Sequence, residues 1–346
     1  MTVDTLRGVN LAGWLMPNPW VTPSLFRATG AADEKSLLSV LGYENYLPLI
    51  RKHREEFITE EDFRQISARG YNAVRIPLPW YVLGEDGPMH ELAEGMRELL
   101  DNAFAWAEAS GIQVVLCISM LPGSRPSADG LQIRIDSARP NRQASLSCVS
   151  QISERYATRG SFFGIEPLDS VVPQRRRGFS VQPGTSLAYL RNFYRDAYDA
   201  FREAAGPGPT FIVSDAGMPS SWRGFMAQRR YENVWLDTHL YRHVQDSETT
   251  GTASVRKLVQ ESARALRDAT RSGLPVMVGE WSAALPISES TMTPEGRIAL
   301  ERVYVAGQLA CFEQADAWFF QTWKTEQRLS PWDARIALSS FEKDIL

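Results

Sequence analysis

Short apolar runs that alternate with helical patterns constrain the fold of this chain more than any other feature of its sequence. Eight of these runs are too apolar to have a solvated face, which is typical of strands in a parallel sheet. They cover residues 8–11, 73–78, 113–119, 162–165, 210–214, 234–240, 275–280 and 317–322. Because successive parallel strands need a crossover, eight alternations in 346 residues predict an α/β protein with a single (β/α)8 barrel spanning residues 1–346.

Helical patterns occupy most of the intervals between these strands. Apolar residues recur there at a spacing of three to four, as on one face of a helix. The segments are 59–69, 91–110, 147–155, 187–204, 221–231, 254–271 and 294–314. Two stretches rich in Pro, Gly, Ser and Arg, 122–140 and 171–184, follow the third and fourth strands. We expect these two loops on the carboxyl-terminal face of the barrel, where barrel enzymes build their active sites.

The composition excludes several classes of partner. A net charge of −4 gives no overall field that would gather nucleic acid or an anionic membrane. No apolar run approaches the roughly 18 residues of a membrane span, and the first residues lack the pattern of a secretory signal. We therefore expect a cytoplasmic protein with neither nucleic acid nor membrane as partner, while the oligomeric state stays open.

The residues that commonly hold metals are sparse. Cys117, Cys148 and Cys311 are odd in number and widely spaced, so they indicate neither a disulfide framework nor a zinc site. The chain has only four histidines, which makes a histidine-rich metal centre unexpected. The sequence therefore requires no metal and no cofactor.

Eight motifs resemble, in order along the chain, the exo-β-1,3-glucanase branch of glycoside hydrolase family 5. The motifs are Arg7-Gly-Val-Asn-Leu-Ala-Gly-Trp14, Pro19-Trp-Val-Thr-Pro-Ser-Leu-Phe26, Phe57-Ile-Thr-Glu-Glu-Asp-Phe63, Asn72-Ala-Val-Arg-Ile-Pro77, Pro122-Gly-Ser124, Ile152-Ser-Glu-Arg-Tyr156, Gly279-Glu-Trp-Ser-Ala-Ala-Leu285 and Trp323-Lys-Thr-Glu326. The resemblance spans nearly the whole chain and implies the same barrel. It says less about activity, because function depends on the site and not on the fold.

Four residues match positions of the family's active site. Glu280 matches the nucleophile, and Arg75 matches the arginine that positions it and keeps it charged by lowering its pKa. His239 and Tyr241 match a His-any-Tyr pair whose tyrosine hydrogen-bonds the nucleophile. The alternative for Glu280 is a buried carboxylate that pairs with Arg75 only to hold the barrel together.

Five residues depart from the family's pattern in the same pocket. Ser170 stands at the position of the acid/base glutamate and Asp169 at the asparagine before it. The remaining three are Ser119 for a site histidine, Gln321 for a sugar-stacking tryptophan and Asn18 for a glutamate that binds sugar hydroxyls. Because the surrounding motifs are intact, these departures favour a changed substrate or a changed reaction.

Loss of the acid limits the chemistry. General acid catalysis supplies about 10² to 10⁴ in rate, and a serine hydroxyl is far too weak an acid to replace it. Asp169 has two interpretations: a new proton donor close to Glu280, where repulsion between like charges raises one of the two pKa values, or an ion-pair partner for a loop arginine. Glu166, by contrast, is expected to be structural.

Two further features belong to the expected pocket mouth. Arg175, Arg176 and Arg177 follow the fourth strand, and three adjacent arginines form either a solvated loop or a clamp for phosphate or carboxylate. Trp80 is a candidate for a pocket wall.

Three hypotheses for function remain open at this point. In the first, an enzyme with redirected chemistry uses Glu280 as nucleophile or general base on a compact ligand, either a biosynthetic intermediate or one with a phosphate or other good leaving group. In the second, a retaining glycosidase or transglycosidase uses Asp169 as its acid. In the third, the barrel binds a small molecule or a short glycoside without catalysis.

Overall fold

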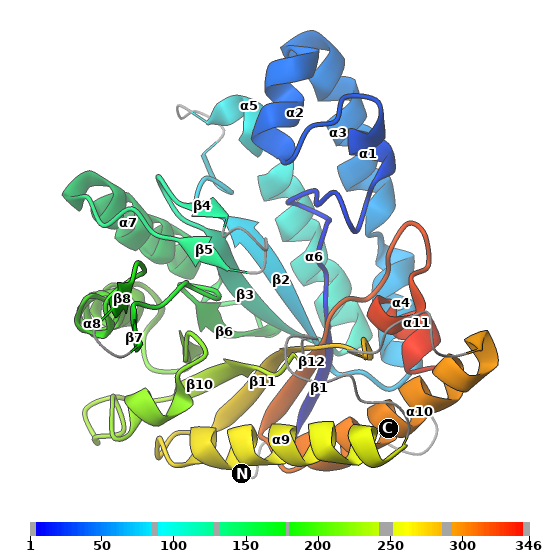
Figure 1. Ribbon diagram of the computed structural model, residues 1–346. Coiled ribbons are helices and arrows are strands. Elements are labelled where there is room, and N and C mark those ends of the chain that lie inside the picture. The colour runs from blue at the N-terminus through cyan, green and yellow to red at the C-terminus, as the bar shows by residue number, and fades with distance from the viewer. Residues whose placement is uncertain are drawn as a thin grey trace.

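Eight parallel strands close into a barrel (Figure 1). The computed structural model describes residues 5–84, 89–126, 132–177, 180–241, 252–285 and 293–341. In the order in which they pair around the barrel, the strands are β1 (Leu6–Asn10), β2 (Ala73–Pro79), β3 (Gln113–Met120), β6 (Phe162–Glu166), β9 (Thr210–Ser214), β10 (Val234–His239), β11 (Val276–Trp281) and β12 (Ala317–Phe320), which returns to β1. Each strand predicted from the sequence is present, and the barrel prediction is confirmed.

Helices surround the barrel and cover one of its ends. They are α1 (Ser24–Arg27), α2 (Glu34–Leu41), α3 (Tyr43–Phe57), α4 (Glu60–Ala68), α5 (His90–Ala93), α6 (Met96–Ser110), α7 (Arg139–Tyr156), α8 (Leu187–Ala205), α9 (Thr252–Thr270), α10 (Pro294–Phe312) and α11 (Ala334–Ala337). The sequence did not predict α1, α2 or α3. Figure 1 shows α2, α3 and α5 above the end toward which the arrowheads of β2 and β3 point.

Two helix predictions need correction. The segment 91–110 is interrupted at Gly95, whose φ of 69° ends α5 and starts α6. The predicted helix 221–231 is wrong: a 3-10 turn, η1 (Pro219–Trp222), is followed by irregular backbone. Gly224 and Met226 have positive φ values of 68° and 54°, which a right-handed helix excludes.

The two predicted loops both carry short antiparallel strand pairs. Within 122–140, β4 (Arg125–Pro126) pairs with β5 (Ile133–Arg134). Within 171–184, β7 (Arg175–Arg177) pairs with β8 (Ser180–Gln182). Both pairs follow barrel strands on the carboxyl-terminal side, so they lie where the sequence placed the loops.

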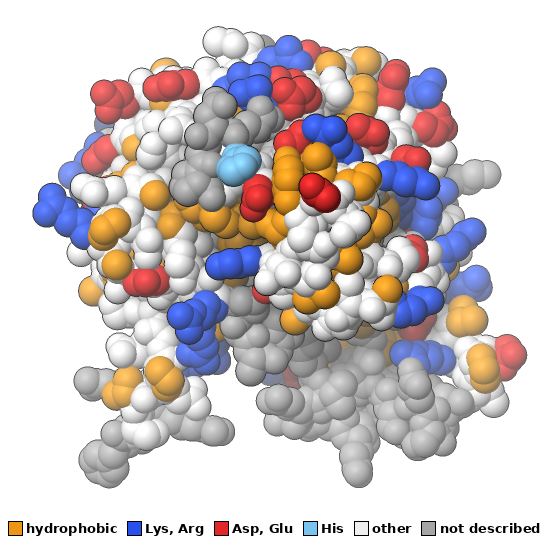
Figure 2. Space-filling model, turned by 90° about the horizontal axis from the view of Figure 1, so that it is seen from above, with side chains coloured by type: hydrophobic (Ala, Val, Ile, Leu, Met, Phe, Trp, Pro, Cys, Tyr) orange, Lys and Arg blue, Asp and Glu red, His pale blue; other side chains and the backbone are white. Residues whose placement is uncertain are grey.

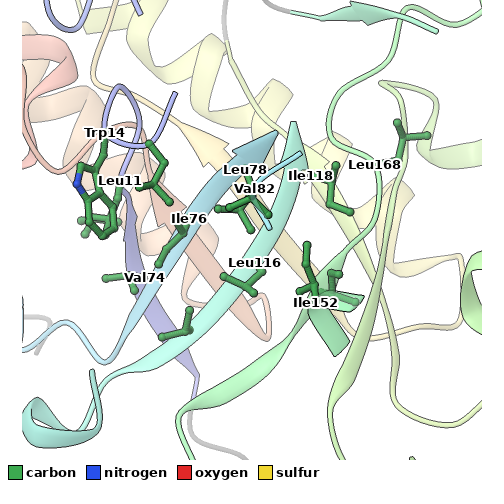
Figure 3. Close-up of a cluster of buried hydrophobic side chains, with 14 of the residues drawn as sticks. Leu11, Trp14, Val74, Ile76, Leu78, Val82, Leu116, Ile118, Ile152 and Leu168 are labelled. Atoms are coloured by element: carbon green, nitrogen blue, oxygen red, sulfur yellow. The ribbon is translucent and has the colours of Figure 1, made fainter. Parts of the chain in front are cut away.

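Alternation along the strands divides the core into an outer and an inner part. Val74, Ile76 and Leu78 of β2 belong to the outer core between strands and helices, together with Leu116 and Ile118 of β3 (Figure 3). Successive side chains of a strand point to opposite faces, so the residues between them face the lumen. A smaller apolar group that includes Met277 and Phe319 fills the lower lumen. The lumen-facing residues above it are polar, and they form the site described next.

The helices and the surface charge bear on the expectations from composition. In the described part of the chain, no helix combines the length and apolar character that crossing a bilayer demands. Figure 2 shows acidic and basic side chains intermixed on the face seen from above. This distribution agrees with the small net charge of −4.

Candidate active site

Arg75 occupies the centre of the lumen and is completely buried. Its Nη1 donates to Glu280 Oε1 at 3.0 Å, and its Nη2 donates to Asp169 Oδ1 at 2.9 Å. Nε and Nη2 both donate to Glu166 Oε2, at 3.0 and 2.8 Å. Three carboxyl groups, two from the end of β6 and the residues after it and one from β11, therefore share one guanidinium. We refer to the Arg75 cluster as Arg75, Glu166, Asp169, Asp237, His239 and Glu280.

Glu280 lies at the carboxyl end of β11 and is held by both of its oxygens. Oε2 accepts the hydroxyl hydrogen of Tyr241 at 2.9 Å, while Oε1 accepts from Arg75. His239 Nδ1 lies 3.5 Å from Oε2. The sequence therefore predicted the neighbours of Glu280 correctly, and two donors fix the orientation of its carboxyl group.

The pKa of Glu280 differs from the expectation. Burial raises it, Asp169 raises it further, and the opposing effects of His239 and Arg75 do not outweigh these two. The prediction that Arg75 would leave this carboxyl with a lowered pKa is therefore wrong in its net direction, although Arg75 acts in the expected sense. A carboxyl group that is removed from water and lies beside another carboxylate resists the charged form even next to a cation.

His239 is held between carboxylates. Its Nε2 lies 2.9 Å from Asp237 Oδ2 and 3.7 Å from Asp169 Oδ1. Burial alone would lower its pKa, but Glu280, Asp237 and Asp169 raise it to about 10. The imidazole is therefore protonated near neutral pH and adds a second positive charge to the Arg75 cluster.

Asp169 is bound as an anion. Its Oδ1 accepts from Arg75 and, at 2.7 Å, from the backbone N–H of Ser170, and the Ser119 hydroxyl also donates to this carboxylate. Burial would raise its pKa, but Arg75 and His239 lower it to about 2. One carboxylate oxygen of Asp169 lies within 4.8 Å of one of Glu280. The two groups are neighbours as expected, yet the raised pKa belongs to Glu280 and not to Asp169.

The two remaining carboxyl groups lie deeper in the lumen. Glu166 is fully buried, and burial raises its pKa well above the usual range despite Arg75. Asp237 accepts the N–H of Gly279 at 2.6 Å. A Cβ atom at position 279 would meet the Asp237 carboxylate at 2.2 Å, so only glycine lets β11 pass this close. The expected structural role of Glu166 agrees with its complete burial against Arg75.

The positions predicted to depart from the family's pattern make different contacts. Ser170 Oγ accepts from Gln132 Nε2 at 3.3 Å. Gln321 is nearly buried, and its Oε1 has no hydrogen-bond partner among the described residues. Asn18 Oδ1 accepts the N–H of Trp20 at 3.3 Å. Trp80 is half-buried beside Tyr81.

The arginine segment does not join the Arg75 cluster through Arg175. That side chain is exposed and donates to the carbonyl of Gly217 at 3.4 Å. The backbone of Arg176 and Arg177 belongs to β7, but their side chains lie outside the described residues. A phosphate clamp formed by this segment therefore stays a prediction.

An aromatic strip leads from Glu280 toward the surface, and the sequence analysis did not single it out. The Tyr241 ring lies 5.7 Å from the ring of Trp332, which lies 5.3 Å from that of Trp20. Trp20 is 37% exposed. Trp20 lies within a motif already compared with the family, and Trp332 follows the last such motif, so aromatic residues next to matched motifs were the available signal.

Asn10 and Cys117 were also missed. Asn10 Oδ1 accepts from Arg75 at 2.9 Å, and its amide donates to the carbonyl of Gly279. Cys117 Sγ lies 3.0 Å from Arg75 Nη2, and burial raises the pKa of its thiol. Both face the lumen from β1 and β3, and alternation from Arg75 could have indicated Cys117.

Three overlapping sets of side chains have the spacing of metal ligands. They are Cys117 with Glu166 and Asp169, Glu166 with Asp237 and His239, and Asp169 with His239 and Glu280. Arg75 already donates to a member of each set, and His239 is protonated near neutral pH. A metal ion would have to displace these hydrogen bonds and a proton, so the donor set fits a cation poorly.

Comparisons with known proteins agree with this geometry. No family model matches the chain. The probable glucan 1,3-beta-glucosidase A of Emericella nidulans is 30% identical over 378 residues, covering 97% of this chain and 89% of that protein. The corresponding protein of Aspergillus niger is 29% identical over 375 residues, covering 97% and 86%.

Solved structures share the fold at lower identity. Rutinosidase from Aspergillus niger superposes with a TM-score of 0.79 at 18% identity, covering 99% of this chain and 98% of that one. PbGH5A, a glycoside hydrolase family 5 enzyme from Prevotella bryantii, gives 0.63 at 15%, covering 99% and 96%. From its sequence relatives and its barrel, this chain belongs to glycoside hydrolase family 5 and is glucan 1,3-beta-glucosidase-like within it.

Proposed function

We propose that this protein is a family 5 enzyme with a rebuilt active site, in which Glu280 attacks a compact glycosyl ligand whose leaving group departs without a protein acid. Conventional hydrolysis of β-1,3-glucan is not its activity in this proposal. The observation that carries it is the contrast between two neighbouring carboxyl groups. Glu280 accepts single hydrogen bonds from Arg75 and Tyr241, whereas Asp169 is held as an anion by Arg75, His239 and the Ser170 N–H.

Glu280 has the properties of a nucleophile or a general base. It lies at the carboxyl end of a barrel strand, and two donors orient it. Attack of its carboxylate on an anomeric carbon would form a glycosyl ester while the bond to the leaving group breaks. The electron pair of that bond goes to the leaving group, so a stable anion such as phosphate or a carboxylate needs no proton.

The residues on the acid side support this restriction on the leaving group. Ser170 matches the position of the family's acid/base glutamate, and its hydroxyl accepts a hydrogen bond from Gln132. Asp169, with its pKa lowered to about 2, holds almost no proton near neutral pH. The hypothesis of Asp169 as substitute acid requires the opposite shift.

The surroundings of Glu280 suit a sugar ring. Tyr241, Trp332 and Trp20 form an aromatic strip, and aromatic faces pack against the apolar faces of sugars. Gln321 offers a buried amide oxygen with no partner among the described residues, which a ligand hydroxyl could satisfy. Ser119 and Asn18 are further polar candidates for ligand contacts.

A series of leaving groups tests the proposal. We expect turnover of 2,4-dinitrophenyl β-glycosides and glycosyl phosphates, and little turnover of alkyl glycosides or laminarin. Azide should accelerate turnover and yield a β-glycosyl azide, because a small anion attacks the glycosyl ester without a general base. Glu280→Gln should abolish all of these reactions while circular dichroism shows an intact fold.

Replacement of Ser170 provides the complementary test. Ser170→Glu should increase turnover of poorly activated glycosides by about 10² to 10⁴, and Ser170→Gln is the matched control without an acid. If Asp169→Asn abolishes turnover of alkyl glycosides yet spares dinitrophenyl glycosides, Asp169 is the acid and the proposal is wrong. Saturable binding of glycosides with no product from any donor would instead identify a non-catalytic binding protein.

A further inference from the structure

A second cavity lies away from the Arg75 cluster, on the flank of the barrel. It has a volume of about 180 Å³ and is bounded by α8 and the irregular segment after η1. Four of its lining residues are arginines: Arg191, Arg195, Arg223 and Arg230. We refer to these four side chains and the space between them as the arginine pocket. None of its lining residues belongs to the Arg75 cluster.

The positive charge of the arginine pocket is not balanced nearby. No acidic residue lines the cavity. Within the described ranges of the chain, none of the four arginines forms an ion pair. Arg191 and Arg195 are also four residues apart on α8, where like charges repel each other. Four guanidinium groups around one small cavity therefore create a strong local preference for an anion.

Aromatic rings hold the guanidinium groups in place. Arg191 and Arg195 lie over the ring of Phe225, with distances of 5.7 and 5.2 Å to its centroid. Arg230 lies 4.6 Å from the centroid of Tyr231 and donates to its hydroxyl. A guanidinium stacked on a ring keeps the N–H groups at its edge available for acceptors. Three of the four guanidinium groups therefore have a ring contact before any ligand enters.

One donor in this pocket remains unsatisfied. The Nε–H of Arg191 is buried and has no hydrogen-bond partner among the described residues. Another nitrogen of Arg191 donates to the Ser221 carbonyl, which ties α8 to η1. A buried donor without an acceptor costs about 1 to 3 kcal/mol, and this donor belongs to an arginine that lines the cavity.

We propose that the arginine pocket binds a small phosphate-bearing anion, either inorganic phosphate or a phosphate monoester. A tetrahedral dianion offers several terminal oxygens, which accept from several guanidinium groups at once. The cavity has room for roughly six waters at about 30 Å³ each, which accommodates a phosphoryl group and a few attached atoms. This site is separate from the proposed function and does not depend on it.

Calorimetric titration of the full chain with inorganic phosphate tests this proposal, with total ionic strength held constant by sodium chloride. We expect one site per chain and a Kd at or below about 1 mM. Arg195→Gln should weaken binding at least tenfold, and the double variant Arg191→Gln with Arg195→Gln should abolish it. Arg229→Gln is the matched control, because Arg229 is exposed in the same segment but does not line the cavity.

Three results would overturn the proposal. The first is no saturable binding of phosphate up to about 10 mM. The second is binding that the Arg191 and Arg195 substitutions leave unchanged but that Glu280→Gln removes, which would place the anion in the barrel lumen. The third is binding of a single-stranded DNA oligonucleotide that depends on the same arginines and that phosphate does not compete away, which would indicate a nucleic acid ligand.

Discussion

Arginine is used in two opposite ways in this protein. In the Arg75 cluster, Arg75 and protonated His239 face four carboxyl groups within a buried lumen. In the arginine pocket, four guanidinium groups face no carboxylate among the residues that line the cavity. A buried charge is tolerated only when it is paired and hydrogen-bonded. A partly exposed charge is solvated by water and remains available to bind a solute.

The two regions differ in how many of their hydrogen-bond donors are already paired within the chain. Most donors and acceptors of the Arg75 cluster are paired within the chain, although Glu166 Oε1 has no hydrogen-bond partner among the described residues, so a ligand must compete with internal hydrogen bonds. The arginine pocket has unused donors, so an anion adds interactions without breaking any. The first region is therefore suited to position reacting groups, and the second is suited to bind an ion.

Among the substitutions that compare the two regions, removal of Arg75 should lower the free energy of unfolding most. Arg75→Met leaves Glu166, Asp169 and Glu280 buried without their shared cation, and loss of one partner of a buried pair costs about 3 to 5 kcal/mol. Urea unfolding measures this loss. Part of it should be recovered at low pH, where the carboxyl groups are neutral. An unchanged unfolding midpoint at pH 7 would show that the cluster does not need its central cation.

The pH dependence of stability should reveal the second cation of the cluster. The pKa of His239 is raised to about 10 from 6.5, so its contribution is fully present below pH 6.5 and is lost as pH rises toward 10. The raised pKa values of Glu166 and Glu280 act in the same direction, because the folded state retains protons that the unfolded state releases.

Unfolding free energies measured between pH 6 and 10 should therefore fall by a few kcal/mol in the native chain. His239→Gln should flatten this decline. For Asp169 the change of stability with pH has the opposite sign. Its pKa is lowered to about 2, so its contribution to stability is present above pH 3.8 and is lost as pH falls below that value. A decline that persists undiminished in His239→Gln would assign the pH dependence to other groups.

Gly279→Ala should disturb the cluster through packing and not through charge. The new Cβ would meet the Asp237 carboxylate at 2.2 Å, and overpacking of this kind costs about 1 to 3 kcal/mol. Because Glu280 is the next residue, activity on a dinitrophenyl glycoside should also fall. Gly160→Ala is the control, since no heavy atom lies within 4 Å of a Cβ placed there. Equal stability of the two variants would contradict the close approach.

The smallest effect is expected in the arginine pocket. Arg195→Gln removes one of several like charges, so in phosphate-free, low-salt buffer it should leave stability unchanged or raise it by up to about 0.5 kcal/mol. Added phosphate should stabilise the native chain more than the variant in thermal unfolding. A clear loss of stability without phosphate would show that the contacts of Arg195 with Phe225 and Asn192 outweigh the repulsion between the arginines.

The sequence predicted the barrel well because each strand is a short apolar run that signals burial on both faces. It also placed Glu280, Arg75, His239 and Tyr241 at strand ends that a closed barrel brings together. It failed at residues 221–231, where the apolar spacing of a helix is present but Trp222, Phe225 and Met226 are buried from a turn instead. Positive φ angles at Gly224 and Met226 leave no periodic signal.

For the candidate site, the sequence identified the residues, whereas the tertiary structure set their charge states and surroundings. Residue types and motif order determined the fold and the family, and they predicted which positions of the site are retained and which are substituted. Only the tertiary structure decided that the lowered pKa belongs to Asp169 and the raised pKa to Glu280, because pKa values depend on distances to Arg75 and His239 and on burial. The arginine pocket likewise has no sequence signature, since its four arginines come from two segments that meet only when the chain is folded.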